Sequence, residues 1–426
     1  MTSFILFFSF ALLVAVGVPI GMALGSASIL SILNLPFLSI NFYTQGLVSG
    51  LDSFPLIAIL LFTLAANIMS HGGISGRLLA LCQSVFGHLT GGLGVVAITS
   101  CIFFASISGT GSATVAAIGL TMIPMMVKNG YDKAYSGAMI ATAGGIGVII
   151  PPSVVMIVYA IVSGQSVSKM FMAGVIPGIL VGLFLLGYNY IQSKKHSYKG
   201  LDNKATWNER WNAFKYAKEA LLLPVIILGG IYSGLFTPTE SAAVAVAYGI
   251  VLSMLYYKEL TLKGLAKITL ESALLVATVL VIVGASVSFG RILTIERIPL
   301  MITDFILNLT DNKILILLAI NILLLIIGTF LETLAAIVIL TPILLPVVTS
   351  VGMDPVHFGI VMVVNLAIGF VTPPLGANLF MASQVGKIPF EDLSRAVLGW
   401  IMTMIAALLL ITFIPGISLW LPNIMS

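Results

Sequence analysis

The fold is decided by the stretch Gly144-Gly145-Ile146-Gly147-Val148-Ile149-Ile150-Pro151-Pro152-Ser153 and by a second stretch 222 positions later, Gly369-Phe370-Val371-Thr372-Pro373-Pro374-Leu375-Gly376. Both lie inside long apolar runs. Paired prolines remove amide donors and restrict the residue before them, and glycines add backbone freedom. A helix is therefore expected to break at each stretch, deep in the membrane, and to leave carbonyls unpaired. Lipid cannot satisfy those groups, so each break must be packed in protein or line a watery cavity.

The composition predicts an all-α polytopic membrane protein. Of the 426 residues, 59% are hydrophobic and 8% are charged, and the mean hydropathy is +1.15. Soluble domains carry about a quarter charged residues. The chain has room for ten or more spans of about 20 residues, in contact with the lipid bilayer. The N-terminal run 3–25 has no cleavage signal, and we expect it to be a retained span. The net charge of +4 reflects loop residues that orient spans and not a nucleic-acid surface.

The two halves of the chain, 1–192 and 219–426, form a repeat joined by a connector at 193–218. Glycines, prolines and turn residues of the two halves coincide at an offset of 222, as in Gly130 and Gly352, Asp132 and Asp354, and the two Pro-Pro pairs. Chance similarity between apolar sequences would not place such residues in the same order. Each half is predicted to contain the same three parts, namely an interfacial arm helix (74–90 and 258–271), a re-entrant helical hairpin (91–127 and 313–349) and a broken transmembrane helix (132–162 and 355–383). A simple loop helix is an equal alternative for each arm.

Basic residues predict the orientation of the chain. Seven Lys and Arg residues crowd the connector and its flanks, which is typical of a cytoplasmic segment. Counting spans outward from the connector places 15 of the 19 Lys and Arg residues on that side. Four crossings then separate the two broken helices, so they run in opposite directions. The repeat is therefore predicted to be inverted, an arrangement typical of secondary transporters with binding sites at the midplane.

The hairpin tips and the breaks offer oxygen ligands without formal charge. Hard cations such as Na⁺ are bound by several carbonyl and hydroxyl oxygens. The predicted ligands of a first sodium site are Ser106, Ser108, Gly109, Gly145, Val148 and Pro151. The repeat predicts a second site at Gly328, Thr329, Gly369, Val371 and Thr372. The alternative is that small residues only allow helices to pack closely; two tips and two breaks in matching positions favour the sites.

Helices that begin at the tips would point their amides toward the centre, where an anion is favoured. The predicted substrate-binding residues are Ser108, Thr110, Ser112, Glu332, Thr333 and Asn378. Glu332 is the only carboxylate near a tip. It has three possible roles, which are cation binding, proton transfer and, ranked first, capping of the helix that follows. The first tip has no carboxylate, which favours Na⁺ over protons as the coupling ion.

No enzyme constellation appears in the sequence. There is no glycine-rich phosphate loop, no nucleophile elbow and no spacing of metal ligands, so we expect neither catalysis nor a cofactor nor a transition metal. Cys82 and Cys101, the only cysteines, lie in or beside apolar stretches and are expected to be packing residues. Without an ATP site, transport energy must come from an ion gradient or from another protein.

Several runs resemble the large membrane subunit of tripartite ATP-independent periplasmic (TRAP) transporters. These runs are Leu51-Asp52-Ser53-Phe54-Pro55-Leu56, Ser108-Gly109-Thr110-Gly111-Ser112-Ala113-Thr114, Ile150-Pro151-Pro152-Ser153, Gly234-Leu235-Phe236-Thr237-Pro238-Thr239-Glu240-Ser241-Ala242-Ala243 and Thr372-Pro373-Pro374-Leu375-Gly376. The resemblance covers essentially the whole chain. It implies Na⁺-coupled uptake of organic acids across a bacterial inner membrane by an elevator mechanism. It also implies two partners, a small four-helix membrane subunit and a periplasmic substrate-binding protein.

The shared motifs do not distinguish among C4-dicarboxylates, sialic acids and other carboxylates as substrates, although the residues around Asp52 and Glu240 weakly favour the sialic acid branch of the family. A stand-alone Na⁺/carboxylate symporter, which resembles this chain in its paired hairpins, is the main alternative. A channel and a non-transporting scaffold are further alternatives.

Overall fold

The computed structural model describes residues 2–35, 37–201 and 204–425, and every regular element in them is a helix. The first half contains α1 (Thr2–Ala15), α2 (Ile20–Ile32), α3 (Ile40–Leu51), α4 (Pro55–His71), α5 (Ile74–Phe86), α6 (Gly92–Ser108), α7 (Gly111–Lys128), α8 (Lys133–Gly145), the 3₁₀ turn η1 (Ile146–Val148), α9 (Val154–Ser163) and α10 (Val167–His196). The second half contains α11 (Trp207–Tyr232), α12 (Pro238–Ile250), the π-helical turn η2 (Val251–Tyr256), α13 (Leu262–Ile295), α14 (Ile298–Leu309), α15 (Lys313–Gly328), α16 (Thr333–Ser350), α17 (Pro355–Gly369), α18 (Ala377–Gly386), α19 (Phe390–Ala396), α20 (Leu398–Phe413) and α21 (Gly416–Met425).

Five helices in the described residues are long and apolar enough to cross a membrane, and two bent pairs raise that number to seven. Other apolar helices, of 10–17 residues, are too short to pass this test alone. Two of them, α9 and α17, are parts of the two broken helices. A polytopic all-helical membrane protein is the architecture that the composition predicts.

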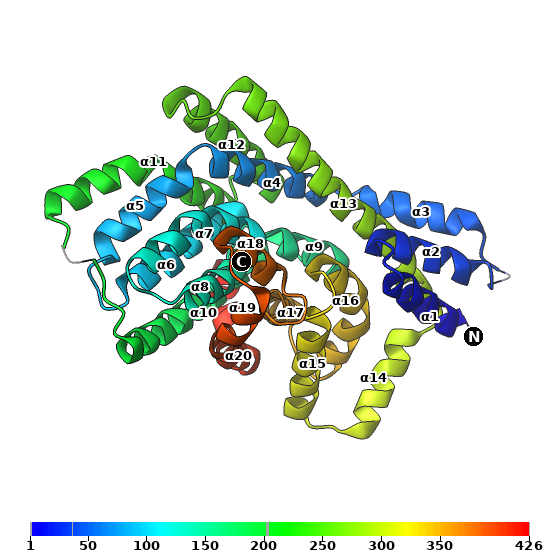
Figure 1. Cartoon of the computed structure of the whole chain (residues 1–426). Coiled ribbons are helices and arrows are strands. Elements are labelled where there is room, and N and C mark those ends of the chain that lie inside the picture. The colour runs from blue at the N-terminus through cyan, green and yellow to red at the C-terminus, as the bar shows by residue number, and fades with distance from the viewer. Residues whose placement is uncertain (1, 36, 202–203, 426) are drawn as a thin grey trace.

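The helices α6–α9 and α15–α18 are the corresponding parts of the two halves. In each half the broken helix is interrupted at the Pro-Pro pair, so that α8 and η1 are followed by α9, and α17 is followed by α18. The two halves exchange partners, because α9 packs against α16 and α18 packs against α7. Figure 1 shows these helices gathered in the middle of the molecule. Each break therefore lies against helices of its own half and of the other half.

Matching residues of the two halves adopt matching local structures. The Asp132 carboxylate accepts a hydrogen bond from the Tyr135 amide (2.7 Å) at the start of α8, and Asp354 accepts from Val356 and His357 at the start of α17. Such caps satisfy amides that the first turn of a helix leaves without a partner. Thr237 and Glu240 form a reciprocal capping box at the start of α12.

The structure corrects the predicted first span at 3–25. The chain turns at Gly17, whose φ is +89°, and α2 begins after Pro19. The helices α1 and α2 then pack against each other at one side of the molecule (Figure 1). The run is apolar throughout, but it does not form one helix. Gly17 adopts a left-handed conformation, and Pro19 cannot continue the helix that precedes it.

The structure also corrects the end of the second arm helix, which was predicted at 258–271. Residues Leu262–Ile295 form a single helix of 34 residues, α13. No proline interrupts this segment and Thr261 caps its start, so nothing in the backbone divides it at Glu271. The first arm, predicted at 74–90, is a separate helix, α5, that follows the αL residue Gly73.

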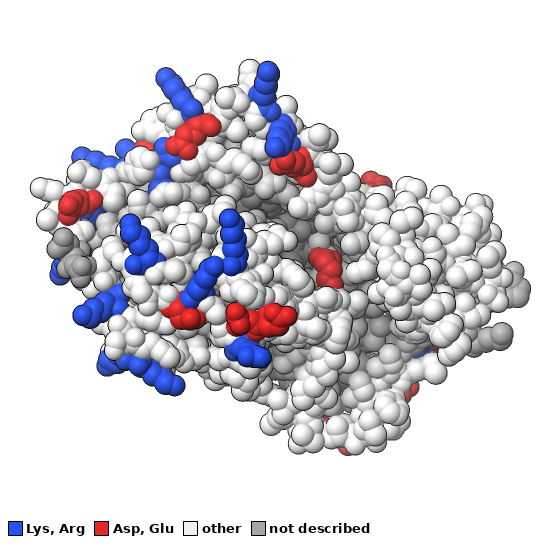
Figure 2. Space-filling view, in the orientation of Figure 1, with Lys and Arg blue, Asp and Glu red and all other residues white. Residues whose placement is uncertain are grey.

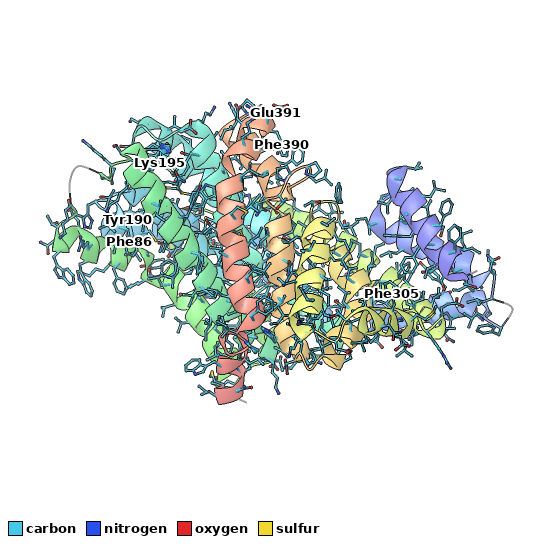
Figure 3. The ribbon with its side chains drawn as sticks, turned by 90° about the horizontal axis from the view of Figure 1, so that it is seen from below. Phe86, Tyr190, Lys195, Phe305, Phe390 and Glu391 are labelled. Atoms are coloured by element: carbon cyan, nitrogen blue, oxygen red, sulfur yellow. The ribbon has the colours of Figure 1, made fainter. Side chains whose placement is uncertain are left out.

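Two groups of helices flank the central body. The helix α13 packs against α2, α3 and α4, and α4 packs against α12, which together form a frame along one side. On another side α10 packs against α20 and α21. Figure 3 shows α10 and α20 running alongside each other, with Lys195 and Glu391 toward the same end of the molecule. Figure 2 shows Lys and Arg spread over the broad part of one face and almost absent over α1–α3.

Arg77 ties the arm helix α5 to the frame. Its side chain is 8% exposed, and its Nη2 lies 2.8 Å from a Glu259 carboxylate oxygen. The guanidinium stacks over the Tyr257 ring at 3.5 Å from its centre, and Nη1 donates to the Gly73 carbonyl at 2.7 Å. A planar guanidinium makes a stacked contact and directed hydrogen bonds at the same time. Arg77 therefore holds together the beginning of α5 and the segment before α13.

We expect Arg77→Ala to lower the free energy of unfolding by about 2 kcal/mol, because it removes a buried cation and the stacked contact while leaving Glu259 half-exposed and solvated. Lys267→Gln is the matched control, since its ion pair with Glu271 spans 3.8 Å at the surface and contributes about 0.5 kcal/mol or less. Thermal denaturation of the purified proteins measures both. Equal shifts in the two variants would contradict the role of Arg77.

Candidate functional site

The first tip (residues 108–111) lies against the first break (149–153). Gly109 has a φ of +60°, and a Cβ atom placed on it would lie 2.5 Å from the Pro152 carbonyl oxygen. A Cβ on Gly147 would lie 2.6 Å from the Thr110 carbonyl oxygen. These approaches need glycine, both for its missing side chain and, at Gly109, for its backbone conformation. The backbones of tip and break are therefore in direct contact, as the first predicted sodium site requires.

Hydroxyl groups gather at this contact. Ser108 Oγ lies 2.9 Å from Thr114 Oγ1, and Thr114 donates to the Thr110 carbonyl at 2.9 Å. Ser153 donates to the Val148 carbonyl at 2.7 Å, so one predicted cation ligand already accepts a hydrogen bond. The Ser106 hydroxyl instead donates to Phe103 at 2.7 Å, within its own helix. Of the predicted first-site residues, Gly145 and Pro151 are also buried, and a Cβ atom placed on Gly145 would lie nearest to Ala367, Met404 and Asn378 and not to this cluster.

The second tip (residues 328–333) meets the second break (370–376) in a corresponding way. A Cβ on Gly369 would overlap the carbonyl oxygen of Gly328. The hydroxyls of Thr329 and Thr372 donate to the carbonyls of Ile326 and Ile368, both at 2.7 Å. Val371 is fully buried beside them. The peptide bonds Pro151–Pro152 and Pro373–Pro374 are both cis, so the two breaks share this feature as well.

A cavity of about 660 Å³ lies between the central body and the frame. Five of the six predicted substrate residues line it: Ser108, Thr110, Ser112, Glu332 and Asn378. Thr333 does not line the cavity and is buried at the start of α16. In Figure 2 a hollow in the face lies at this place, between α4 and α13 on one side and α18 on the other. The structure thus brings together residues that are up to 270 positions apart in the chain (Ser108 to Asn378).

Four helix N-termini reach this cavity. Thr110 and Gly111 belong to the start of α7, Val154 to α9, Glu332 to α16 and Ala377 to α18. Each N-terminus carries about half a positive charge and free amides. The described lining contains no Lys, Arg or His. Among the described lining residues, positive charge is therefore offered only by these helix N-termini, which are suited to an anion.

Glu332 caps α16, because its carboxylate accepts from the Ala335 amide at 3.2 Å. This confirms the role ranked first for it in the sequence. Asn378, on α18, donates from Nδ2 to the Ala141 carbonyl at 3.1 Å and so links the second half to α8 of the first. Its Oδ1 is buried and has no hydrogen-bond partner.

Sequence reasoning missed the frame's share of the cavity wall. Thr63 and Asn67 on α4, and Thr278 on α13, line it opposite the tips. Asn67 donates to the Ser272 hydroxyl at 2.8 Å, which joins α4 to α13. The signal was present, since polar residues four positions apart in an apolar helix lie on one face. Neither residue belongs to a repeat block or a turn motif, and those patterns directed the prediction.

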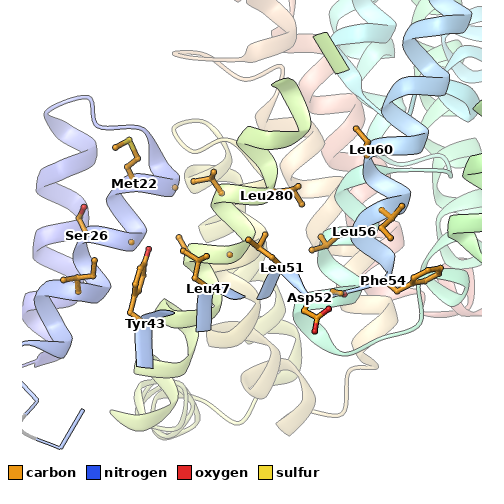
Figure 4. A pocket seen from close by; sticks show the side chains of 18 residues that line it. Met22, Ser26, Tyr43, Leu47, Leu51, Asp52, Phe54, Leu56, Leu60 and Leu280 are labelled. Carbon is orange, nitrogen blue, oxygen red and sulfur yellow. The ribbon is translucent and has the colours of Figure 1, made fainter. Parts of the chain in front are cut away.

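A second cavity of about 740 Å³ lies outside this region, between α2, α3, α4 and α13 (Figure 4). Its walls are mostly aliphatic, with Tyr43 and Asp52 among the few polar side chains. It contains none of the predicted ion or substrate residues. Although it is larger, it offers no set of oxygen ligands and no helix N-terminus from the breaks. The cavity at the tips is therefore the candidate site.

Residues 7–417 match the family model described as the tripartite ATP-independent periplasmic transporter, DctM component. The chain is 49% identical over 98% of its length to the isethionate TRAP transporter permease protein DctMQ of Oleidesulfovibrio alaskensis, of which it spans 66%. It is 38% identical to the C4-dicarboxylate TRAP transporter large permease protein DctM of Rhodobacter capsulatus, with 100% of both chains covered. It is 39% identical to the sialic acid TRAP transporter large permease protein SiaM of Vibrio cholerae, covering 96% of this chain and 95% of that one.

The fold is similar to that of a solved structure, the YdaH transporter of Alcanivorax borkumensis, described as having an unusual topology. The TM-score is 0.65 at 16% identity, and 90% of each chain is covered. At this identity the similarity concerns the fold alone. The sequence relatives are named for three different substrates, and the 39% identity to the sialic acid protein lies between the 38% identity to the C4-dicarboxylate protein and the 49% identity to the isethionate protein.

We expect Gly369→Ala to lower the free energy of unfolding by about 2 kcal/mol, because the new methyl group overlaps the Gly328 backbone and neither main-chain segment can rotate away. Gly187→Ala is the control. It lies inside α10 with no atom near the position of the new methyl group, so it should be neutral or stabilising by up to about 1 kcal/mol. Thermal unfolding of the two purified variants measures the difference, and similar stabilities would show that the Gly328–Gly369 contact is loose.

Proposed function

The chain belongs to the family of DctM components of tripartite ATP-independent periplasmic transporters, and on this basis we propose that it is the large membrane subunit of a Na⁺-coupled importer of small organic anions. It is a transporter component and not an enzyme. The proposed location is the bacterial inner membrane, with the face rich in Lys and Arg toward the cytoplasm.

The observation that carries the proposal is the charge of the cavity. Four helix N-termini and several hydroxyls face it, but the only ionisable group among its described lining residues is the Glu332 carboxylate. An organic anion next to a carboxylate, out of bulk water, needs compensating positive charge. Helix dipoles provide part of it. Sodium ions carried with the substrate would provide the rest, which makes binding of anion and cation mutually dependent.

The two proposed sodium sites are the contacts between tips and breaks. At the first, the proposed ligands are the Ser108 hydroxyl and the carbonyls around Gly109, Gly145 and Val148, which are uncharged oxygens of the kind that suits a hard cation of single charge. The close approach of Gly109 to Pro152 supports this proposal. At the second, Gly328, Gly369 and Thr372 repeat the arrangement. Because each site is built from a tip and a break, an ion bound there holds together the backbones that form the substrate cavity.

The proposed mechanism is of the elevator type. The body of α6–α9 and α15–α18 would carry ions and substrate past the frame of α4, α12 and α13, with α5 as a brace. The cavity lies at the boundary between these two groups, as such a movement requires. Its hollow opens on the face shown in Figure 2, where many Lys and Arg side chains lie, and we assign the structure to a cytoplasm-facing state on this basis.

The proposed partners are a small membrane subunit and a periplasmic binding protein. The chain spans only 66% of the isethionate relative named DctMQ, so that protein contains a further segment outside the matched region. The test is reconstitution in liposomes with both partners of the same system, using isethionate, C4-dicarboxylates and sialic acid with and without a Na⁺ gradient. Uptake that needs neither partner would select a stand-alone symporter, and flux without any ion gradient would select a channel.

We expect Ser108→Ala and Thr372→Val each to raise the Na⁺ concentration for half-maximal uptake about tenfold, because each removes one oxygen from a proposed sodium site. Ser136→Ala is the control, since its hydroxyl is buried in α8 and bonds only to the Asp132 carbonyl. The amount of folded protein in the membrane should be the same for all three. An unchanged Na⁺ dependence in the two site variants would count against the assignment of both sites.

A further inference from the structure

Thr63 is an exception among the buried threonines of this protein. Its residue is 4% exposed, and its hydroxyl has no hydrogen-bond partner. A threonine in a helix ordinarily bonds back to the carbonyl four residues earlier, as Thr142 and Thr412 do here. Buried hydroxyls without a partner are rare because they cost free energy. The free hydroxyl of Thr63 therefore points to a ligand that binds next to it.

Among the described lining residues of this cavity, the only other buried side-chain atom without a hydrogen-bond partner is Asn378 Oδ1. The identity of that atom follows from its neighbour. The Ala141 carbonyl only accepts hydrogen bonds, so the amide nitrogen of Asn378 must face it, and the oxygen is the atom left without a partner. Asn378 is fully buried. The cavity thus has an unused hydroxyl on its frame wall and an unused acceptor on its body wall.

A ligand hydroxyl group between these two atoms would satisfy both, since it accepts a hydrogen bond through its oxygen and donates one through its hydrogen. A plain carboxylate or sulfonate cannot, because it has no donor for Asn378. The Glu332 carboxylate on the same wall adds a further acceptor and disfavours a second acidic group there. We propose that Thr63 is a substrate-binding residue of the frame and that, with Asn378, it selects organic anions that carry a hydroxyl group. This inference rests on the proposed function.

Thr63→Val tests the inference with little risk to folding. Valine has nearly the same shape, and the hydroxyl that it removes has no partner in the protein, so thermal stability of the ligand-free chain should be unchanged or higher. Thr63→Ser keeps the hydroxyl. Thr142→Val is the matched control, because it also removes a buried threonine hydroxyl from a helix but lies outside the cavity.

The measurement is calorimetric affinity of the purified full-length chain, in Na⁺ and in choline buffer, for two pairs of acids that differ by one hydroxyl. The pairs are isethionate with ethanesulfonate and malate with succinate. In Na⁺ we expect the native chain to bind the hydroxylated member of at least one pair about tenfold more tightly, which corresponds to one good hydrogen bond. Thr63→Val should reduce that preference to about threefold or less, whereas Thr63→Ser and Thr142→Val should retain it.

The outcomes separate this inference from the proposed function. Na⁺-dependent binding without preference for the hydroxylated acid, or a preference that survives Thr63→Val, overturns the inference and leaves Na⁺-coupled anion transport standing. If none of the four acids binds the native chain in Na⁺, the inference is overturned, whereas the proposed function is decided by the uptake measurement in liposomes with both partners. Loss of the preference in Thr63→Val together with its retention in Thr63→Ser supports a direct contact between the Thr63 hydroxyl and the ligand.

Discussion

The structure depends on one constraint, which is that main-chain polar groups inside a bilayer must find partners within the protein. Each Pro-Pro break leaves carbonyls and amides outside the helical pattern, and each is covered by the tip of a helix pair. The closest approach is between backbones, at Gly109 with Pro152 and at Gly369 with Gly328. No side chain fits between these segments. The contacts that make the breaks tolerable are the same ones that collect oxygen atoms into possible cation sites.

Exchange of partners between the two halves turns two such contacts into one site. Because α18 packs against α7 and α9 against α16, helices from both halves begin around a single cavity. Asn378 is one such contact between the halves, since it belongs to the second half and its side-chain amide donates to the Ala141 carbonyl in the first. Neither half alone could surround an anion with four helix starts. The repeat is therefore a requirement of the site as well as a trace of its origin.

Much of this arrangement can be predicted from residues whose backbone demands are strong. Prolines, glycines and capping aspartates determine local structure in any surroundings. The breaks, the tips and the helix starts at Asp132 and Asp354 can therefore be predicted from the sequence. The turn at Gly17 was hidden inside a uniformly apolar run, and the continuity of α13 was hidden by polar residues near its start. Thr63 and Asn67 depend only on which helix faces the cavity, and packing of distant segments decides that. Their role becomes visible only when the frame and the body are placed together.

A hydrogen bond between the frame and the substrate has a consequence for movement of the body. A ligand shifts a conformational equilibrium only by the difference between its affinities for the two states. Ligands held entirely within the moving body would bind equally in both positions and would bias neither. In the proposed elevator movement, the proposed contact to Thr63 would exist in only one of them, because Thr63 lies on α4 and the tips lie on the body. The loaded carrier would then be stabilised where that contact forms, and the substrate would have to lose one hydrogen bond before the body could move away. The strength of that single contact has to stay modest, since a stronger one would slow the return as much as it favours the arrival.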